Sequence, residues 1–214
     1  MEKNIALFGT SADPPTIGHK KILEELSKIY SLTITYASNN PQKEHKEDIS
    51  IRSILLKTLI KDLDNPKILF SQELSSQWAI ESIKKCKHLY KLKNLDFVIG
   101  SDLIADIFCW RNFDNIVKEV SFFIIKREGY NIEENTLKRL RKHKVNFKVS
   151  TFNIPKISSS MVRLNTNHSI LPKSLMDIVK KNNLYMSPNK YNDFFSCSNQ
   201  SSCWRFRGQC KKNT

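Results

Sequence analysis

The sequence predicts an α/β fold in which an open, mostly parallel sheet is flanked by helices. Short apolar runs alternate along the chain with segments of helical periodicity. These runs are apolar throughout and do not alternate with polar residues, which is typical of strands buried on both faces of a parallel sheet. The 214 residues are 40% hydrophobic, so the chain can bury the core of a domain of ordinary size.

Strands and helices take turns in the first part of the chain. Residues 5–8 form a short apolar run, after which Ile22, Leu23 and Leu26 fall at helical spacing. A polar segment at 39–48 is predicted to be a loop. The pattern predicts strand 5–8, helix 18–30, strand 32–37, helix 50–62, strand 67–70 and helix 78–90.

The same alternation continues as far as Tyr185. Pro172 opens the last helix, a position where proline is tolerated. Right-handed crossovers between parallel strands place every strand's carboxyl end on one edge of the sheet, where we expect a ligand. The pattern predicts strand 97–99, helix 112–120, strand 122–125, helix 132–143, a strand around 146–150, a short helical stretch from Ser158 and a last helix from Leu175 to Asn182.

The composition changes after residue 186. Residues 187–214 have no hydrophobic period, are rich in Ser and Asn, and carry +4 of the chain's net charge of +14. Such a segment lacks the apolar residues that would compensate for ordering it. We therefore expect one domain over 1–186, followed by a poorly ordered polar and basic tail over 187–214.

The net charge of +14 raises the question of a polyanionic partner. Lysine greatly outnumbers arginine, and the lysines are scattered over every predicted helix face. That distribution is typical of a solvated basic surface. We therefore rank nucleic acid well below a nucleotide-sized anionic ligand.

The cysteines and the N-terminus bear on location. The five cysteines are an odd number without a secretory signal, which argues against a disulfide framework. Cys197, Cys203 and Cys210 lack the close spacing of a structural zinc site, so no protein-held metal is expected. No run is long enough to span a membrane, and a cytoplasmic protein without a membrane partner is expected.

The stretch IALFGTSADPPTIGHKKIL, residues 5–23, is the first candidate for chemistry. Small residues at 9–11 follow the first strand, and their backbone N–H groups could approach a phosphate. Gly18 and His19 begin the next helix, where the dipole favours an anion. Thr16 and His19 could both donate hydrogen bonds toward one point. The alternative is that the two prolines form a stiff turn and His19 is a capping histidine.

The stretch KISSSMVRLN, residues 156–165, is the second candidate. Hydroxyls and free N–H groups at a helix start, with Arg163 one turn later, are typical of a phosphate site. The alternative is an ordinary serine N-cap.

The stretch FVIGSDLIADIFCW, residues 97–110, is the third candidate. Asp102 follows a buried strand and could accept hydrogen bonds from ribose hydroxyls. Trp110 could offer its face to a flat heterocycle. The alternatives are a helix cap for Asp102 and a core position for Trp110.

The three stretches together resemble the bacterial nicotinate-nucleotide adenylyltransferases. The resemblance rests on GTSADPPTIGH (9–19), GSD…W (100–110) and ISSSMVR (157–163), in this order and spacing. These match the (H/T)-x-G-H and I-S-S-[TS]-x-[IV]-R signatures of a nucleotidyltransferase superfamily. The resemblance covers roughly 1–186 and includes SSQWAIESI (75–83). It implies a Rossmann-like, nucleotidyltransferase-type sheet.

The chain also departs from that family's pattern. Ala12 stands where the family usually has Phe, and Thr16 where it often has His. Trp78 and Ala79 replace the usual Tyr-Thr in a segment that helps to recognise the pyridine carboxylate, largely through backbone N–H groups.

The resemblance implies transfer of the adenylyl group of ATP to nicotinate mononucleotide, giving nicotinate adenine dinucleotide and pyrophosphate. Catalysis would consist of positioning and charge stabilisation, with Mg²⁺ held mainly by the ATP phosphates. Catalytic roles are implied for His19, Thr16, Arg163 and Lys43. ATP and phosphate binding is implied for Gly9, Thr10, Ser11, Gly18, Ser158, Ser159 and Ser160. Mononucleotide binding is implied for Trp78, Ala79, Gly100, Asp102, Trp110 and Arg127.

Other functions remain open at this point. Nicotinamide mononucleotide, phosphopantetheine or a cytidylyl acceptor could replace nicotinate mononucleotide within the superfamily. A basic nucleic-acid-binding relative without the chemistry is an alternative of another class. A homo-oligomer is also possible.

Overall fold

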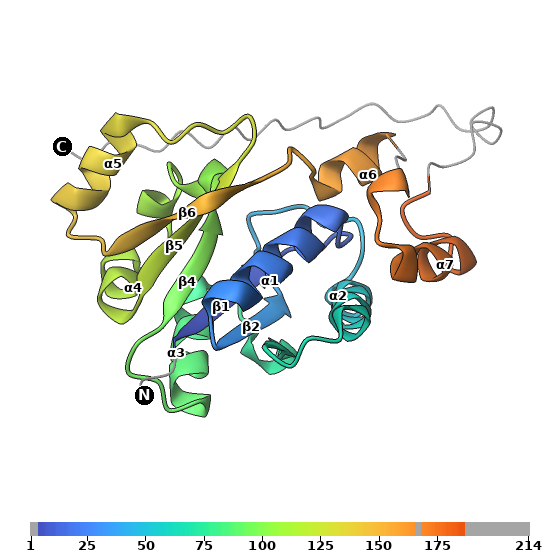
Figure 1. Ribbon diagram of the computed structural model, residues 1–214, viewed down its shortest axis with the longest axis horizontal. Helices are drawn as coiled ribbons and strands as arrows, with labels where there is room; N and C mark the ends of the chain where they lie inside the picture. The colour runs from blue at the N-terminus through green and yellow to red at the C-terminus, as the bar shows by residue number, and fades with distance from the viewer. Residues whose placement is uncertain (1–3, 166–167, 187–214) are drawn as a thin grey trace, which may run out of the picture.

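A computed structural model describes residues 4–165 and 168–186. Its centre is a six-stranded sheet in the order β3-β2-β1-β4-β5-β6, and every neighbouring pair is parallel (Figure 1). The strands are β1 (Ile5–Thr10), β2 (Leu32–Ala37), β3 (Ile68–Phe70), β4 (Asp96–Gly100), β5 (Ser121–Arg127) and β6 (Phe147–Ile154). The helices are α1 (Ile17–Ile29), α2 (Ile49–Leu63), α3 (Ala79–Leu89), α4 (Phe113–Glu119), α5 (Glu134–Lys142), α6 (Ser159–Asn165) and α7 (Lys173–Lys181). The predicted parallel α/β fold is confirmed.

The predicted elements are all present, and four strands, β1, β4, β5 and β6, are longer than expected. β1 continues through Thr10, because Gly9 and Thr10 pair with Tyr36 and Ala37 of β2. The expectation that 9–11 forms a turn is therefore wrong for the first two residues. β5 reaches Arg127, and β6 continues past a register shift to Ile154.

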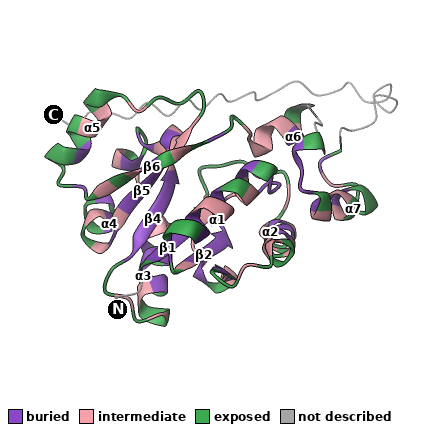
Figure 2. Ribbon diagram, viewed as in Figure 1, coloured by how far each residue is buried: buried purple, intermediate pink, exposed green. Residues whose placement is uncertain are grey.

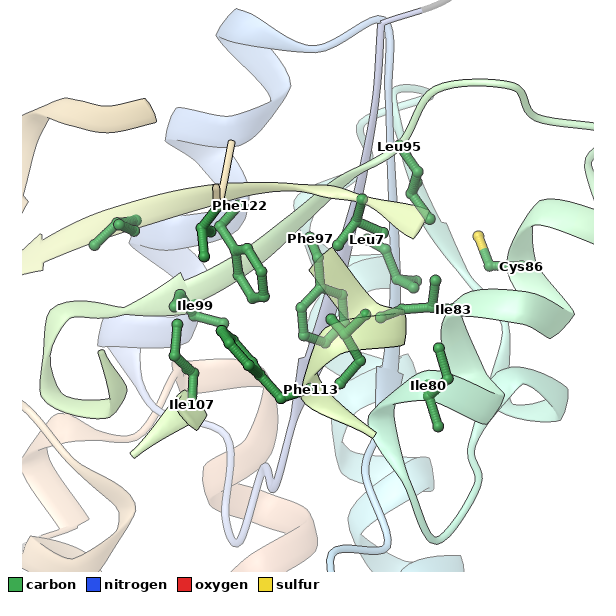
Figure 3. Packing of buried hydrophobic residues seen from close by; sticks show 14 of the residues in the cluster. Leu7, Ile80, Ile83, Cys86, Leu95, Phe97, Ile99, Ile107, Phe113 and Phe122 are labelled. Carbon is green, nitrogen blue, oxygen red and sulfur yellow. The ribbon is translucent and has the colours of Figure 1, made fainter. Parts of the chain in front are cut away.

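The two faces of the sheet carry separate cores. On one face, α3 and α4 pack against alternate strand residues, and Figure 3 shows Ile80 and Ile83 of α3 directed at Leu7 and Phe97. On the other face, α1 packs on the intervening strand residues such as Phe8. Figure 2 shows buried residues along the central strands and exposed residues on the outer faces of α1 and α5. The alternation between faces fixes the register of each strand.

A third core lies beside the sheet. In Figure 1 the chain leaves β6, crosses above α1 and places α6 and α7 next to α2. Leu55 and Leu59 of α2 pack there with Val162 of α6 and Leu175 and Val179 of α7. This packing brings the C-terminal helices back to the carboxyl end of β1.

The strand order reverses between β1 and β4, whose crossovers run to opposite faces of the sheet. In open parallel sheets such a switch point leaves a crevice at the carboxyl ends of the strands. Among the helices described, none is long and apolar enough to cross a membrane. Cys86 and Cys109 form no disulfide within the described part of the chain, whereas the expected tail and its cysteines lie outside the described residues.

Candidate active site

A cavity of about 470 Å³ lies at the carboxyl ends of β1 and β4. Its wall includes residues from both faces of the sheet and from α6. The predicted site residues that line it are Gly9, Thr10, Ser11, Gly18, His19, Lys43, Trp78, Ala79, Gly100, Asp102, Trp110, Arg127, Ser158, Ser159, Ser160 and Arg163. Thr16 is the one predicted site residue that does not line it.

His19 lies in the first turn of α1 and is held through Nδ1. The backbone N–H of Thr16 donates to Nδ1 at 3.1 Å, and Thr16 Oγ1 lies 2.9 Å from the same nitrogen. The arrangement is a capping box in which histidine takes the place usually held by Glu or Gln. Because Nδ1 accepts, the neutral ring carries its proton on Nε2. The capping and ligand-binding interpretations of His19 are thus compatible, since they use different ring nitrogens.

The charge of His19 is set by its surroundings. Burial, together with the positive charges of Arg127 and Lys43, lowers the pKa of His19 to about 4. The ring is therefore neutral at pH 7 and offers one N–H donor to the cavity.

The structure revises the expected position of Thr16. Its side chain is fully buried and contacts His19 at Nδ1. It does not face the cavity beside His19, because the hydroxyl occupies the N-cap position of α1. Thr16 is a positioning residue for the imidazole.

Arg163 and the serines before it line the cavity beside the turn that precedes α1. The guanidinium of Arg163 donates to the carbonyl of Asp13 at 2.7 Å and to Ser160 Oγ at 3.0 Å. Ser159 Oγ donates to the carbonyl of Pro14 at 2.8 Å. These bonds attach α6 to the turn before α1 and fix Arg163 at the cavity wall.

Arg127 and Asp102 form an ion pair on the cavity wall. Arg127 Nη1 lies 2.9 Å from Asp102 Oδ2, and Nη2 donates to the carbonyl of Ile157. The second carboxylate oxygen, Oδ1, is buried and has no partner among the residues described. It lies so close to Gly100 that an added Cβ there would clash with it, which explains the glycine at the end of β4.

Aromatic side chains form the cavity wall on the face of the sheet that α3 and α4 cover. Trp110 lies edge-on to Phe97, with ring centroids 6.2 Å apart. Trp78 precedes α3, and Ala79 is that helix's first residue. The indole of Trp110 is only partly buried, so the alternative of a purely core tryptophan does not hold.

The sequence of this chain is similar to those of known proteins. The cytidylyltransferase-like family model matches residues 7–165. A curated Campylobacter jejuni (strain 81-176) protein, named "Probable nicotinate-nucleotide adenylyltransferase", is 33% identical over 185 residues, which are 83% of this chain and 94% of that protein. The chain belongs to the nicotinate-nucleotide adenylyltransferases of the cytidylyltransferase-like family. A Synechocystis protein of the same name is 29% identical, covering 85% of this chain and 98% of its own.

Solved structures agree with this adenylyltransferase assignment. A Plasmodium falciparum nicotinic acid mononucleotide adenylyltransferase complexed with NaAD is 27% identical and superposes with a TM-score of 0.71. The likeness covers 86% of this chain and 98% of that one. A structure of that protein complexed with APC has a TM-score of 0.69.

Sequence reasoning missed Asp13, which is buried in the turn before α1. Its carboxylate accepts from the backbone N–H groups of Lys46 and Glu47, at 2.7 and 3.3 Å. It also accepts from the hydroxyl of Tyr185 at 2.9 Å, and His45 Nδ1 lies 3.8 Å away. Asp13 thus joins the turn before α1, the loop that carries Lys43 and the end of the described chain.

Two further residues of the same region were missed. Arg52 is buried and donates to the carbonyls of Ser11, Ser38 and Glu47, so it fixes both ends of the loop at 39–48. His45 lines the cavity, and its Nε2 is buried without a partner among the described residues. Both sit in segments that resemble ordinary polar loop and helix sequence, which left no signal for their burial.

The loop that holds Lys43 closes over the cavity wall. Burial lowers the pKa of the Lys43 ammonium, as do the nearby charges of Arg127 and Arg163, whereas Asp102 raises it. The three cations are therefore close enough to act on one polyanion, as expected of an adenylyltransferase's phosphate site.

Gly9 also has a packing role that its sequence motif does not indicate. A Cβ at Gly9 would lie 2.6 Å from the hydroxyl oxygen of Tyr36. The glycine therefore makes room for a buried tyrosine of β2, and burial raises the pKa of that phenol to about 12. Gly9 still lines the cavity, through its backbone.

Proposed function

We propose that this chain transfers the adenylyl group of ATP to nicotinate mononucleotide, giving nicotinate adenine dinucleotide and pyrophosphate. The observation that carries the proposal is a neutral His19 whose free N–H donor lies in one cavity with three cations and a partly exposed indole. The family assignment supports the same reaction.

The reaction is an in-line displacement at the α-phosphorus of ATP. A phosphate oxygen of the mononucleotide forms the new P–O bond, while the bond to the bridging α,β-oxygen breaks and pyrophosphate departs with that electron pair. His19 Nε2 donates to a non-bridging α-phosphate oxygen, where negative charge accumulates. His19 takes no proton, because its pKa of about 4 keeps it neutral throughout.

The cations hold the phosphates on the α1 side of the cavity. Arg163 lies in the last turn of α6 and donates to Ser160 at its start, and we assign it the β- and γ-phosphates, which leave as pyrophosphate. Lys43 joins it from the loop, and Gly18 leaves the first turn of α1 open to an anion. We propose that Mg²⁺ enters as part of the substrate, bound to the ATP phosphates.

The aromatic side of the cavity receives the mononucleotide. Trp110 presents its exposed face to the pyridine ring. The unpartnered Oδ1 of Asp102 accepts from a ribose hydroxyl, while Oδ2 remains paired with Arg127. A cytoplasmic location and a homo-oligomer remain predictions.

The test uses the purified full chain with ATP and Mg²⁺. Pyrophosphate release and a product with the mass of nicotinate adenine dinucleotide are expected with nicotinate mononucleotide. The matched control is His19→Ala, which should lose activity on the order of 10²–10³-fold with an unchanged circular dichroism spectrum. Release with phosphopantetheine or a cytidylyl acceptor, and with no pyridine mononucleotide, would overturn the proposal.

A further inference from the structure

Arg111 is a charged cavity residue outside every motif described above. Its guanidinium carbon lies 4.9 Å from the centroid of the Trp78 ring, and both residues line the cavity. Arg111 directly follows Trp110 and is exposed. An arginine stacked on an aromatic face is oriented, so the indole fixes where this charge lies.

The position of Arg111 separates it from the phosphate cations. Besides burial, the charges of Arg127 and Lys43 lower the pKa of His19 in the first turn of α1, and those of Arg127 and Arg163 lower the pKa of Lys43. Trp78 and Trp110 instead pack with the core under α3 and α4, on the opposite face of the sheet. Arg111 therefore lies on the aromatic side, where the proposed function places the heterocycle.

The surroundings of Arg111 suit an anionic group on that ring. Ala79 opens the eleven-residue helix α3, and no side chain caps its N–H groups. Ser76 Oγ is buried at the cavity wall without a partner among the described residues. Ala79 itself has no side-chain donor, so charge recognition at this point falls to backbone N–H groups and to Arg111.

We infer that Arg111, held by Trp78, pairs with the ring carboxylate of the acceptor and selects a pyridine carboxylate over the carboxamide. The inference rests on the proposed function and adds a specificity-determining side chain to it. A neutral carboxamide cannot form the charge-assisted bonds that a guanidinium makes with a carboxylate.

The test compares kcat/KM for nicotinate and nicotinamide mononucleotides in the full chain. Arg111→Gln should lower the acid-to-amide ratio by about 10-fold to 100-fold, as expected for a lost hydrogen-bonded charge. The ratio for Arg111→Lys should lie between those of the wild type and Arg111→Gln, because lysine keeps the charge and loses the planar guanidinium. Trp78→Leu should lower the ratio as well, and Trp78→Phe should largely restore it, because Trp78 acts through Arg111.

Varying the ionic strength tests the inference on the wild-type protein, so this measurement does not depend on a variant that folds. Because Arg111 is exposed, the wild-type ratio should fall as ionic strength rises. Arg141→Gln is the matched control, since Arg141 pairs with Glu134 on the surface of α5, and it should leave the ratio unchanged. An unchanged ratio in Arg111→Gln, or equal losses with both acceptors, would overturn the inference. Absence of turnover by the wild type with either acceptor would instead overturn the proposed function.

Discussion

His19 divides its two ring nitrogens between structure and chemistry. Nδ1 accepts a hydrogen bond from the N-cap N–H of α1, and in the proposed mechanism Nε2 donates to the substrate. The motif therefore needs the residue at position 16 to hold the ring, and a threonine does so from a fully buried position. This explains why Thr16 and His19 are three positions apart, since the N-cap and N3 positions have that spacing.

Thr16 should affect turnover only through His19. Thr16→Val removes the hydroxyl beside Nδ1, and we expect kcat to fall about 10-fold, with little change in the KM for ATP. Thr16→Ser should restore most of the activity. A double-mutant cycle with His19→Ala checks the assignment, because Thr16→Val should then cost almost nothing. Independent, additive losses would contradict it.

The lowered pKa of His19 makes stability depend on pH. Between pH 6.5 and about 4 the unfolded chain binds a proton at His19 that the folded chain excludes. The free energy of unfolding should therefore fall as pH falls through this window, by about 1–3 kcal/mol from this group. Urea unfolding of the wild type and His19→Gln at pH 7 and pH 4.5 measures the difference.

The control for this pH effect is His88→Gln, since His88 is exposed at the end of α3. It should leave the pH dependence of the wild type intact. Equal slopes for the wild type and His19→Gln would contradict the pKa assignment.

At the scale of elements, the last residues of β1 both pair with β2 and line the cavity. Gly9 and Thr10 continue the pairing with β2, and Ser11 then leaves the sheet toward α1. The cavity edge is therefore as rigid as the sheet itself. A site built on strand ends is held more firmly than one on a free turn.

Gly9→Ala tests the contact with Tyr36. The added methyl would meet a buried ring that cannot move away, so the free energy of unfolding should fall by about 1–3 kcal/mol. Urea denaturation measures it. Tyr36→Phe in the same chain removes the nearest atom and should recover part of the loss, whereas full tolerance of Gly9→Ala would contradict the packing.

The elements could be predicted because their signals are local. Periodicity along 18–30 or 97–99 depends on neighbours within one turn or one strand, and the bounds held to within a few residues. Pairing partners extended β1, β5 and β6 beyond their apolar runs. Such pairing depends on strands far away in the sequence, so no local pattern could show it.

At the scale of the whole molecule, the missed residues share one property. Asp13 bonds to Tyr185, 172 positions away, and Arg52 bonds to Ser11, 41 positions away. Their burial is a product of the fold and not of their own segments. The motif residues were predictable because the family's pattern marks them, whereas Arg52 and Arg111 lie outside that pattern and Asp13, although inside the first stretch, was interpreted only as part of a turn.

Truncation tests which residues the domain requires. A chain ending at Met186 should fold and turn over like the full chain, because the sheet, the cavity wall and Tyr185 are retained. A chain ending at Leu184 loses a buried ring and its bond to Asp13, so it should lose about 2–4 kcal/mol of unfolding free energy.

Tyr185→Phe in the chain ending at Met186 separates the two contributions. It keeps the packing of the ring and loses only the bond, so its cost should be about 1–2 kcal/mol, with a raised KM for ATP because the loop with Lys43 loosens. Equal stability of the chains ending at 184 and 186 would contradict the role of Tyr185.

The bond between Asp13 and Tyr185 also bears on how the protein is made. Residue 13 leaves the ribosome long before residue 185, which emerges only after all six strands have been translated. Until then the carboxylate of Asp13 lacks its last partner, and α7 cannot pack on α2. We expect a nascent chain to hold a formed sheet and an incomplete nucleotide site, so that activity begins only when the end of the domain has cleared the exit tunnel.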